Sequence, residues 1–272
     1  MKTVVVSGGT DGIGRGIASA LLRRGDTVVV IGRDERKGQA FLDEARRLGA
    51  PASFLRADLS LVAENDKVVA RVEAEHPVVD VLVLCARHFR STRAVTPEGF
   101  EYNFALLYLS RFLLSHGLAD RLTASTRTPV VANVGGPGGD LGEFRWDDYD
   151  HVRDYSGVGA MMHAGGLAND MLGAAFAQAH DAIRYLLINP GPTASSFAGE
   201  YDAATLGHIE MMKRFGKPVE QAAARVLEHI DHPPAAPLSA FSDSGPISLA
   251  HRNFAGEPAR RLHELTLRAL SR

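Results

Sequence analysis

A short stretch near the beginning of the chain, Thr3–Ala18, constrains the fold more than any other. Its β-branched run Val4–Val6 predicts a buried strand and ends in a glycine-rich turn. A helical pattern follows the turn, because apolar residues recur there at the spacing of one helix face: Ile13, Ile17, Leu21 and Leu22. Strand, glycine turn and helix in this order are the context that a dinucleotide-binding fingerprint needs.

Three glycines have separate roles in this interpretation. Gly8 lets the chain turn, Gly12 lets the backbone approach a pyrophosphate, and Gly14 lets the helix pack close to the strand. The helix N-terminus then offers free N–H groups and the positive end of its dipole to the phosphates. The alternative is a purely structural glycine turn. The residues beside the glycines are expected to line the same cofactor site: Ser7, Thr10, Asp11 and Ile13.

Length and composition fit an ordinary globular protein. The chain has 272 residues, of which 45% are hydrophobic and 23% charged, and this size suits one large α/β domain or two small ones. The net charge of −2 argues against nucleic-acid or anionic-membrane partners, and no apolar stretch is long enough to span a bilayer. A single cysteine, Cys85, excludes an internal disulfide framework, and without a signal-peptide pattern a cytoplasmic location is expected.

Short apolar runs alternate with longer helical patterns as far as Ile188. The predicted strands are Val4–Val6, Thr27–Ile31, Ala52–Leu55, Val79–Leu84, Pro129–Val134 and Ile183–Ile188. The predicted helices are Gly14–Arg24, Arg36–Leu48, Leu61–Glu75, Gly99–Leu118 and Gly157–Ala179, with an irregular segment at Gly135–Tyr155 and a loop over the core at Pro233–Pro246. This alternation predicts an α/β fold, a single-domain Rossmann-type doubly wound parallel sheet flanked by helices, over residues 1–272.

In a doubly wound sheet the ligand lies beyond the carboxyl ends of the strands. The second predicted strand is followed by Gly32, Arg33 and Asp34, so the strand end itself is not acidic, and Arg33 can form bidentate bonds to a 2′-phosphate. The alternative for Arg33 is a solvated surface side chain. After the third strand, Asp58 can accept a hydrogen bond from an adenine amino group, or it can cap the next helix, as Ser60 also can.

Three segments together resemble the short-chain dehydrogenase/reductase family, over about Thr3–Thr193. The turn Ser7–Gly14 matches that family's pattern T-G-x-x-x-G-x-G, and Arg56–Leu59 matches its adenine-contacting segment. Pro190–Thr193 matches the rigid P-G-x-x turn beside the nicotinamide. Arg33 stands where NADP-preferring members carry arginine, so the resemblance implies NADP as cofactor. It also implies cofactor contacts from Asp58, Leu59, Pro190, Gly191 and Thr193.

A second resemblance is to the subgroup that includes retinol dehydrogenases. Members of that subgroup carry an aromatic-Asp-Asp segment before the catalytic helix and Leu-Ala-Asn after the catalytic lysine. The matching parts of this chain are Gly142–Asp148, which is followed by Tyr155, and Leu167-Ala168-Asn169.

The four catalytic positions of the family carry other residues in this chain. The family uses a tyrosine as general acid or base, a lysine four residues later that lowers the tyrosine pKa, a serine that orients the substrate carbonyl, and an asparagine that holds a proton-relay water. Aligned on Leu167-Ala168-Asn169, the tyrosine and lysine positions fall on Met162 and Gly166. The serine and asparagine positions fall on Gly136 and Leu107. Methionine and glycine cannot transfer protons, so the usual acid/base step has no agent.

Few residues are candidates for a replacement chemistry, and none predicts a metal site. Arg87 can bind an anionic substrate group or stabilise an oxyanion, or it can contact a cofactor phosphate. His88 can titrate near neutrality, or it is simply solvated. Tyr155 can overhang the site, although packing is its other use. His163 is about 100° round the helix from Met162 and is expected to point away.

Three functions are compatible with these observations. The first is an NADP(H)-binding oxidoreductase that acts on a small organic molecule by atypical means, with residues 195–272 covering the substrate. The second is a non-redox cyclase, isomerase or dehydratase on the same scaffold, and the third is a noncatalytic NADPH-binding protein. The helices Gly99–Leu118 and Gly157–Ala179 are apolar over more than one face, and family members pair through them, so a homodimer or homotetramer is expected.

Overall fold

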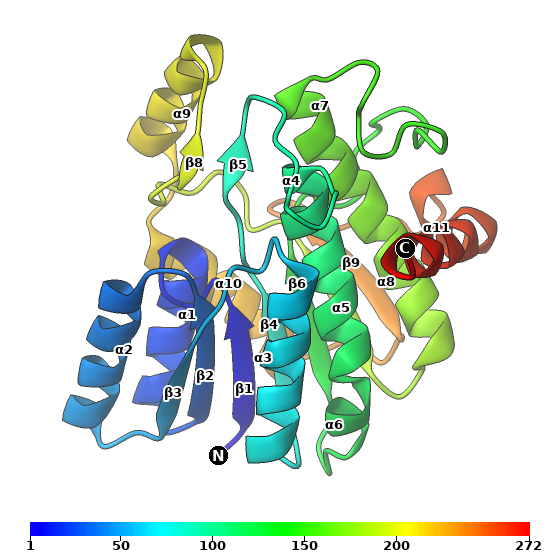
Figure 1. Ribbon diagram of the computed structural model, residues 1–272. Helices are drawn as coiled ribbons and strands as arrows, with labels where there is room; N and C mark the ends of the chain where they lie inside the picture. The colour runs from blue at the N-terminus through cyan, green and yellow to red at the C-terminus, as the bar shows by residue number, and fades with distance from the viewer.

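The computed structural model describes residues 1–272 and contains an eight-stranded sheet between two layers of helices (Figure 1). The strand order is β10-β9-β7-β6-β4-β1-β2-β3, and all neighbours are parallel except β9 and β10. The strands are β1 (Thr3–Ser7), β2 (Thr27–Gly32), β3 (Ala52–Arg56), β4 (Val81–Leu84), β6 (Val130–Val134), β7 (Arg184–Ile188), β9 (Leu238–Ser242) and β10 (Gly245–Pro246). The predicted α/β doubly wound sheet and its six predicted strands are confirmed.

Each face of the sheet carries its own hydrophobic core. Alternate residues of β1 divide between the cores, because Val4 and Val6 join one cluster and Val5 joins the other. The helices over the first face are α1 (Gly12–Arg23), α2 (Glu35–Leu48) and α10 (Val219–Asp231). The helices over the second face are α3 (Val62–Glu75) and the longer helices described below. Burial on both faces explains why the central strands read as continuous apolar runs.

One stretch predicted to be a loop is part of the sheet. The prediction for Pro233–Pro246 is wrong, because the stretch contains β9, which pairs in parallel with β7, and the short antiparallel β10. Only Ala240 of β9 is buried, so this strand lacks the apolar run by which the other strands are recognised. Backbone hydrogen bonds to β7 define it instead.

Each of the two long predicted helices contains a π-helical turn. The first consists of α4 (Tyr102–Phe104), the π-helical η1 (Ala105–Leu109) and α5 (Ser110–Gly117), followed by α6 (Ala119–Thr123). The second consists of α7 (Gly157–Met162), the π-helical η2 (His163–Leu167) and α8 (Ala168–Ala179). The two π-helical turns touch each other, and Asn169 Nδ2 donates to the carbonyls of Leu107 (2.8 Å) and Ala164 (2.6 Å), one in each turn. Such turns recur at functional sites.

The last helix, α11 (Gly256–Leu270), lies beside α8 (Figure 1), and its His263 ring contacts Phe112 and His116 on α5. It buries Leu262 and Ala269 in the same core as those helices, and Thr266 Oγ1 lies 2.7 Å from the Tyr108 hydroxyl. α11 therefore covers part of these apolar faces within one chain, whereas Val158 and Met162 on α7 are exposed. Association of copies stays a prediction with no assigned surface. No helix of the protein is long and apolar enough to cross a membrane.

Three histidines lie together where α11, which carries His263, packs against α5 and the end of α8. The ring of His116 on α5 is 5.8 Å from that of His180 and 5.1 Å from that of His263, measured between centroids. The buried His116 Nε2 has no hydrogen-bond partner. Burial, assisted by the two neighbouring histidines, lowers the pKa of His116 from 6.5 to about 3.

This depressed pKa predicts a loss of stability in mild acid. A histidine held neutral in the folded state contributes stability above the unfolded pKa of 6.5, and the contribution is lost as the pH falls from there toward 3. We expect His116→Leu to reduce the loss of unfolding free energy between pH 7.5 and pH 5 by about 2 kcal/mol. Urea unfolding at the two pH values measures it, with the exposed His208→Leu as control. An unchanged pH dependence in His116→Leu would contradict the assignment.

Candidate functional site

Two adjoining cavities lie at the carboxyl edge of the sheet. Figure 1 shows α7 and α9 (Ala203–Phe215) at this edge, and Met161, Met162 and Met212 from these helices line the second cavity. The first has a volume of about 570 Å³ and follows the ends of β1, β2, β3 and β4. The second has a volume of about 380 Å³ and lies between the ends of β6 and β7 and the η2 turn. Five residues line both cavities: Ile13, Arg87, Val134, Ser195 and Phe197. An elongated ligand can therefore occupy the two together.

The glycine turn has the geometry that the sequence predicts. Gly8 has a positive φ of 68°, and a Cβ there would lie 2.7 Å from Ala86 Cα. A Cβ on Gly14 would lie 2.4 Å from the Gly8 carbonyl oxygen, so Gly14 permits the close contact of α1 with the turn. Gly12, with φ 52°, faces open space with only Ser195 Cβ at 3.5 Å. Asp11 caps α1 by accepting from the Gly12 N–H at 2.8 Å.

Two cationic side chains lie at the far end of the first cavity, beyond β2. Arg33 donates to the Tyr102 hydroxyl at 3.2 Å and lies 3.6 Å from an Asp58 carboxylate oxygen. Lys37, which the sequence did not single out, pairs with Asp11 at 2.5 Å from the first turn of α2. Its signal was its place in the first turn of the helix that follows β2, close to the strand end where Arg33 lies. Both cations line the cavity.

The other predicted cofactor residues divide between the two cavities. Thr10, Asp11, Ile13, Asp58 and Leu59 line the first, and Pro190, Gly191 and Thr193 line the second. Ser7 lines neither, since it is buried and its hydroxyl accepts from the N–H of Cys85 at 3.2 Å. Its place in the structure is to join the ends of β1 and β4.

Neither Asp58 nor Ser60 caps α3, so that alternative for Asp58 is wrong. Asp58 accepts from the Ser60 N–H (3.0 Å) and hydroxyl (2.7 Å), which closes a local turn. The free N–H groups of Val62 and Ala63 at the start of α3 donate instead to Glu98, at 2.6 and 2.9 Å. The side chain that caps α3 therefore comes from a distant loop. The second carboxylate oxygen of Asp58 faces Arg33, and Asp58 lines the cavity.

The second cavity gathers the four positions that the family alignment assigns to catalytic side chains. Leu107, Gly136, Met162 and Gly166 all line it. These residues come from four separate elements: η1, the end of β6, α7 and η2. The fold therefore brings together positions that are far apart in the sequence. No Asp, Glu, His, Lys, Tyr or Cys lines this cavity. It therefore contains no side chain that exchanges protons readily near neutral pH.

Arg87 lies at the junction of the two cavities, open to both. Its guanidinium donates to the Met161 sulfur at 3.1 Å, a weak acceptor, and forms no ion pair. The surrounding protein lowers the Arg87 pKa, although an arginine stays charged after such a shift. An uncompensated positive charge thus faces the point where the cavities meet.

The two other predicted catalytic residues do not reach the second cavity. His88 lines the first, with its Nδ1 3.4 Å from the Tyr102 hydroxyl, and burial lowers its pKa. Tyr155 lines neither, because its hydroxyl accepts from Asn103 Nδ2 at 2.9 Å and lies 3.4 Å from a carboxylate oxygen of the buried Glu101. Burial and that carboxylate raise the Tyr155 pKa, which opposes proton transfer near neutrality.

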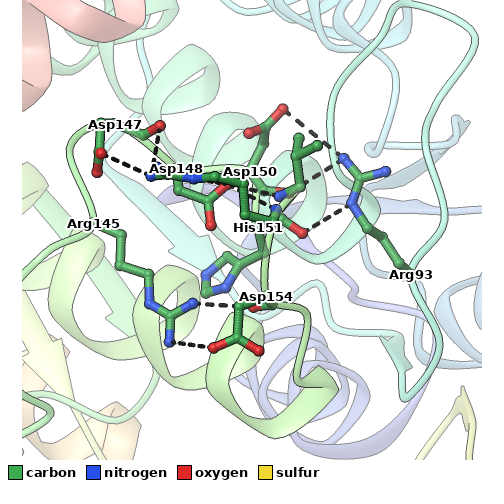
Figure 2. Close-up of polar contacts among 9 residues, drawn as sticks. Arg93, Arg145, Asp147, Asp148, Asp150, His151 and Asp154 are labelled. Atoms are coloured by element: carbon green, nitrogen blue, oxygen red, sulfur yellow. Dashed lines mark hydrogen bonds and ion pairs between the residues drawn. The ribbon is translucent and has the colours of Figure 1, made fainter.

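The aromatic-Asp-Asp segment folds into an ion-pair network at one side of the site (Figure 2). Asp148 is buried and accepts from the N–H groups of Val152 (2.8 Å) and Arg153 (3.2 Å). Arg93 donates to the His151 carbonyl at 3.1 Å, and Figure 2 shows it reaching the loop from a separate segment. None of the residues labelled in Figure 2 lines either cavity. The network shapes the loop before α7 and does not supply the missing acid.

Comparisons with known proteins agree with this fold. Residues 2–205 match the family described as short chain dehydrogenase. The chain is 32% identical to human retinol dehydrogenase 13 over 132 residues, 48% of this chain and 40% of that protein. It is 29% identical to oxidoreductase AN1596 of Emericella nidulans over 194 residues, 70% of this chain and 57% of that protein. The matches thus span about half the length of these relatives.

Solved structures resemble the chain over most of its length. A short chain dehydrogenase from Burkholderia cenocepacia J2315, solved in complex with NADP, aligns with a TM-score of 0.67. The alignment covers 90% of this chain and 97% of that one at 20% sequence identity. At this identity the likeness concerns the fold.

Proposed function

The chain belongs to the short-chain dehydrogenase family, and from this premise we propose that it binds NADP(H) across the two cavities. The observation that carries the proposal is the glycine turn, whose Gly12 leaves open the space at the α1 N-terminus that any larger residue would fill. Backbone N–H groups and the helix dipole there suit a pyrophosphate. A bound nicotinamide would supply or accept hydride at the second cavity, where Pro190, Gly191 and Thr193 are placed to hold its carboxamide.

The preference for NADP(H) over NAD(H) rests on the end of β2. Gly32 leaves no carboxylate at the strand end, and Arg33 and Lys37 bring two positive charges to the same part of the first cavity. A 2′-phosphate suits the planar donor edge of arginine and the ammonium of lysine. The solved NADP complex of a structural relative is consistent with this choice.

We expect calorimetric titration to give an NADPH affinity at least about tenfold higher than that for NADH. The double variant Arg33→Ala/Lys37→Ala should bind NADPH and NADH with similar affinities, because the 2′-phosphate contacts are removed, whereas the loss of the ion pairs to Asp58 and Asp11 affects both cofactors alike. Arg36→Ala, on the same helix but outside the cavity, is the matched control. Equal affinities of the wild-type protein for the two cofactors would refute the preference.

We further propose an oxidoreductase that acts on a small organic substrate without a side-chain acid. The second cavity combines apolar walls with the Arg87 guanidinium and has no proton-exchanging residue. Hydride addition to a carbonyl carbon leaves an oxyanion, which a positive charge stabilises and which water can protonate. In this proposal Arg87 provides that charge, and residues 195–272 cover the substrate, which the lining of the cavity by Ser195, Phe197 and Met212 supports. Stoichiometric oxidation of NADPH with product formation would test the redox step.

The same bare cavity favours one competing function, a protein that binds NADPH without turning over a substrate. The two functions differ in one measurable outcome: a protein that only binds NADPH would keep its cofactor affinity, but no substrate would cause NADPH to be consumed.

Self-association is also proposed from the family resemblance alone, and light scattering at micromolar concentration tests it. A monomer would mean that α11 occupies the face through which family members pair.

A further inference from the structure

A second arginine, Arg111, lies at the floor of the second cavity and was not singled out by the sequence. It is on the first turn of α5, directly after the π-helical turn η1, and only 3% of it is exposed. Its Nη1 donates to the Val134 carbonyl at 2.8 Å and to Asn133 Oδ1. These bonds fix the guanidinium against the end of β6.

The rest of the Arg111 guanidinium has no partner. Nε is enclosed without an acceptor, and Nη2 donates to no protein atom while the residue lines the cavity. No ion pair includes Arg111, and its side-chain partner Asn133 is neutral, as are Asn169 and Tyr185, to which Asn133 donates. Burial, with a small contribution from the charge of Arg87, lowers the pKa of Arg111 to about 10. A buried charge without a counterion is costly for a fold to keep.

One glycine lies directly beside the guanidinium. A Cβ on Gly135 would lie 3.4 Å from Arg111 Nη1, the nitrogen that bonds Val134 and Asn133, so a side chain there would press on the bonded edge of the group. Arg111 and Gly135 both line the second cavity, and a ligand in that cavity therefore meets the guanidinium from this side.

We propose that Arg111 and Arg87 bind the carboxylate of an organic acid whose apolar body lies in the second cavity. This inference rests on the proposed function and names its substrate class. The cofactor phosphates do not account for Arg111, because it lines only the second cavity, away from the glycine turn. A planar carboxylate matches the guanidinium group. The walls that would receive the apolar body are Leu107, Leu141, Met161, Met162, Phe197 and Met212.

The test compares acids with their uncharged amides. Acetate, phenylacetate and 4-phenylbutyrate are titrated by calorimetry into NADPH-saturated protein, each beside the matching amide, at pH 7.5. At least one of the two aromatic acids should bind about tenfold or more tightly than its amide, and acetate should bind more weakly than both aromatic acids because it lacks the apolar body. An absence of charge preference in all three pairs would overturn the proposal.

Variants assign the preference to the two arginines. Arg111→Met and Arg87→Met should each reduce the acid-to-amide ratio about tenfold, and the exposed Arg71→Met on α3 should leave it unchanged. Arg111→Met should keep its NADPH affinity within about twofold, which also shows that the variant is folded. A double variant Arg87→Met/Arg111→Met that keeps the acid preference would refute the site. If wild-type protein failed to bind NADPH, the proposed function would fall, and titration of the cofactor-free protein with the same pairs would still decide the anion site.

Discussion

Restoring three of the family's four catalytic side chains, the serine, the tyrosine and the lysine, should give this protein at least about 100-fold more activity on a simple carbonyl compound. The variant is Gly136→Ser/Met162→Tyr/Gly166→Lys, and all three positions already line the second cavity. A placed general acid contributes on the order of 10²–10⁴-fold, and the lower end is expected because grafted groups are held imperfectly. NADPH consumption with benzaldehyde, followed by absorbance, measures the gain.

One obstacle to this variant is visible in the structure. A Cβ at position 166 would meet Leu141 Cδ1 at 2.7 Å, so Leu141→Ala accompanies the three substitutions and removes that clash, whereas the Gly136 carbonyl oxygen, at 3.1 Å, has to shift slightly. Position 136 has open space for a serine. The matched control replaces Met162 by phenylalanine in the same background, since phenylalanine has the ring of tyrosine without its hydroxyl. A folded, NADPH-binding variant with no more activity than this control would show that the alignment of α7 and η2 is wrong.

Gly12→Val should weaken NADPH binding at least about 100-fold, which corresponds to about 2.7 kcal/mol. The valine side chain would project from the α1 N-terminus into the first cavity, where a pyrophosphate needs direct contact with backbone N–H groups. The protein around it would shift little, because only Ser195 Cβ lies near, at 3.5 Å. Calorimetric titration of NADPH measures the loss.

Gly49→Val separates this effect from backbone strain. Gly49 has φ 63° at the C-cap of α2, close to the 52° of Gly12, and nothing lies within 4 Å of a Cβ placed there. The two variants therefore share the cost of a β-branched residue at positive φ, and only one of them fills the cavity. Equal NADPH affinities in the two variants would contradict a cofactor at the glycine turn.

The sequence predicted the fold and many of the residues that line the first cavity, for a common physical reason. Glycine spacing, β-branched strands and strand-end residues are local signals, and the first cavity consists of such segments placed side by side by the sheet. Gly12, Arg33 and Asp58 accordingly lie together as expected. β9 escaped prediction because it is held by backbone bonds rather than by an apolar pattern.

The reacting end of the site was less predictable because it depends on long-range packing. Arg111 reads as an ordinary helix residue, and only the fold places it beneath Gly135 with a free Nη2. Tyr155 precedes α7 as expected, yet Asn103 and Glu101 hold its hydroxyl away from both cavities. The π-helical turns that line the second cavity are also not visible in the spacing of apolar residues along the sequence.

The central claim is that a working cofactor site adjoins a reaction site without a proton-transferring side chain. Its most direct test measures NADPH affinity and NADPH consumption on the same wild-type sample, with simple aldehydes and ketones as substrates. A short-chain dehydrogenase that carries the tyrosine and lysine is assayed alongside. We expect tight NADPH binding together with turnover at least about 100-fold below that of the comparison enzyme. Turnover equal to that of the comparison enzyme, or no binding of NADPH, would contradict the claim.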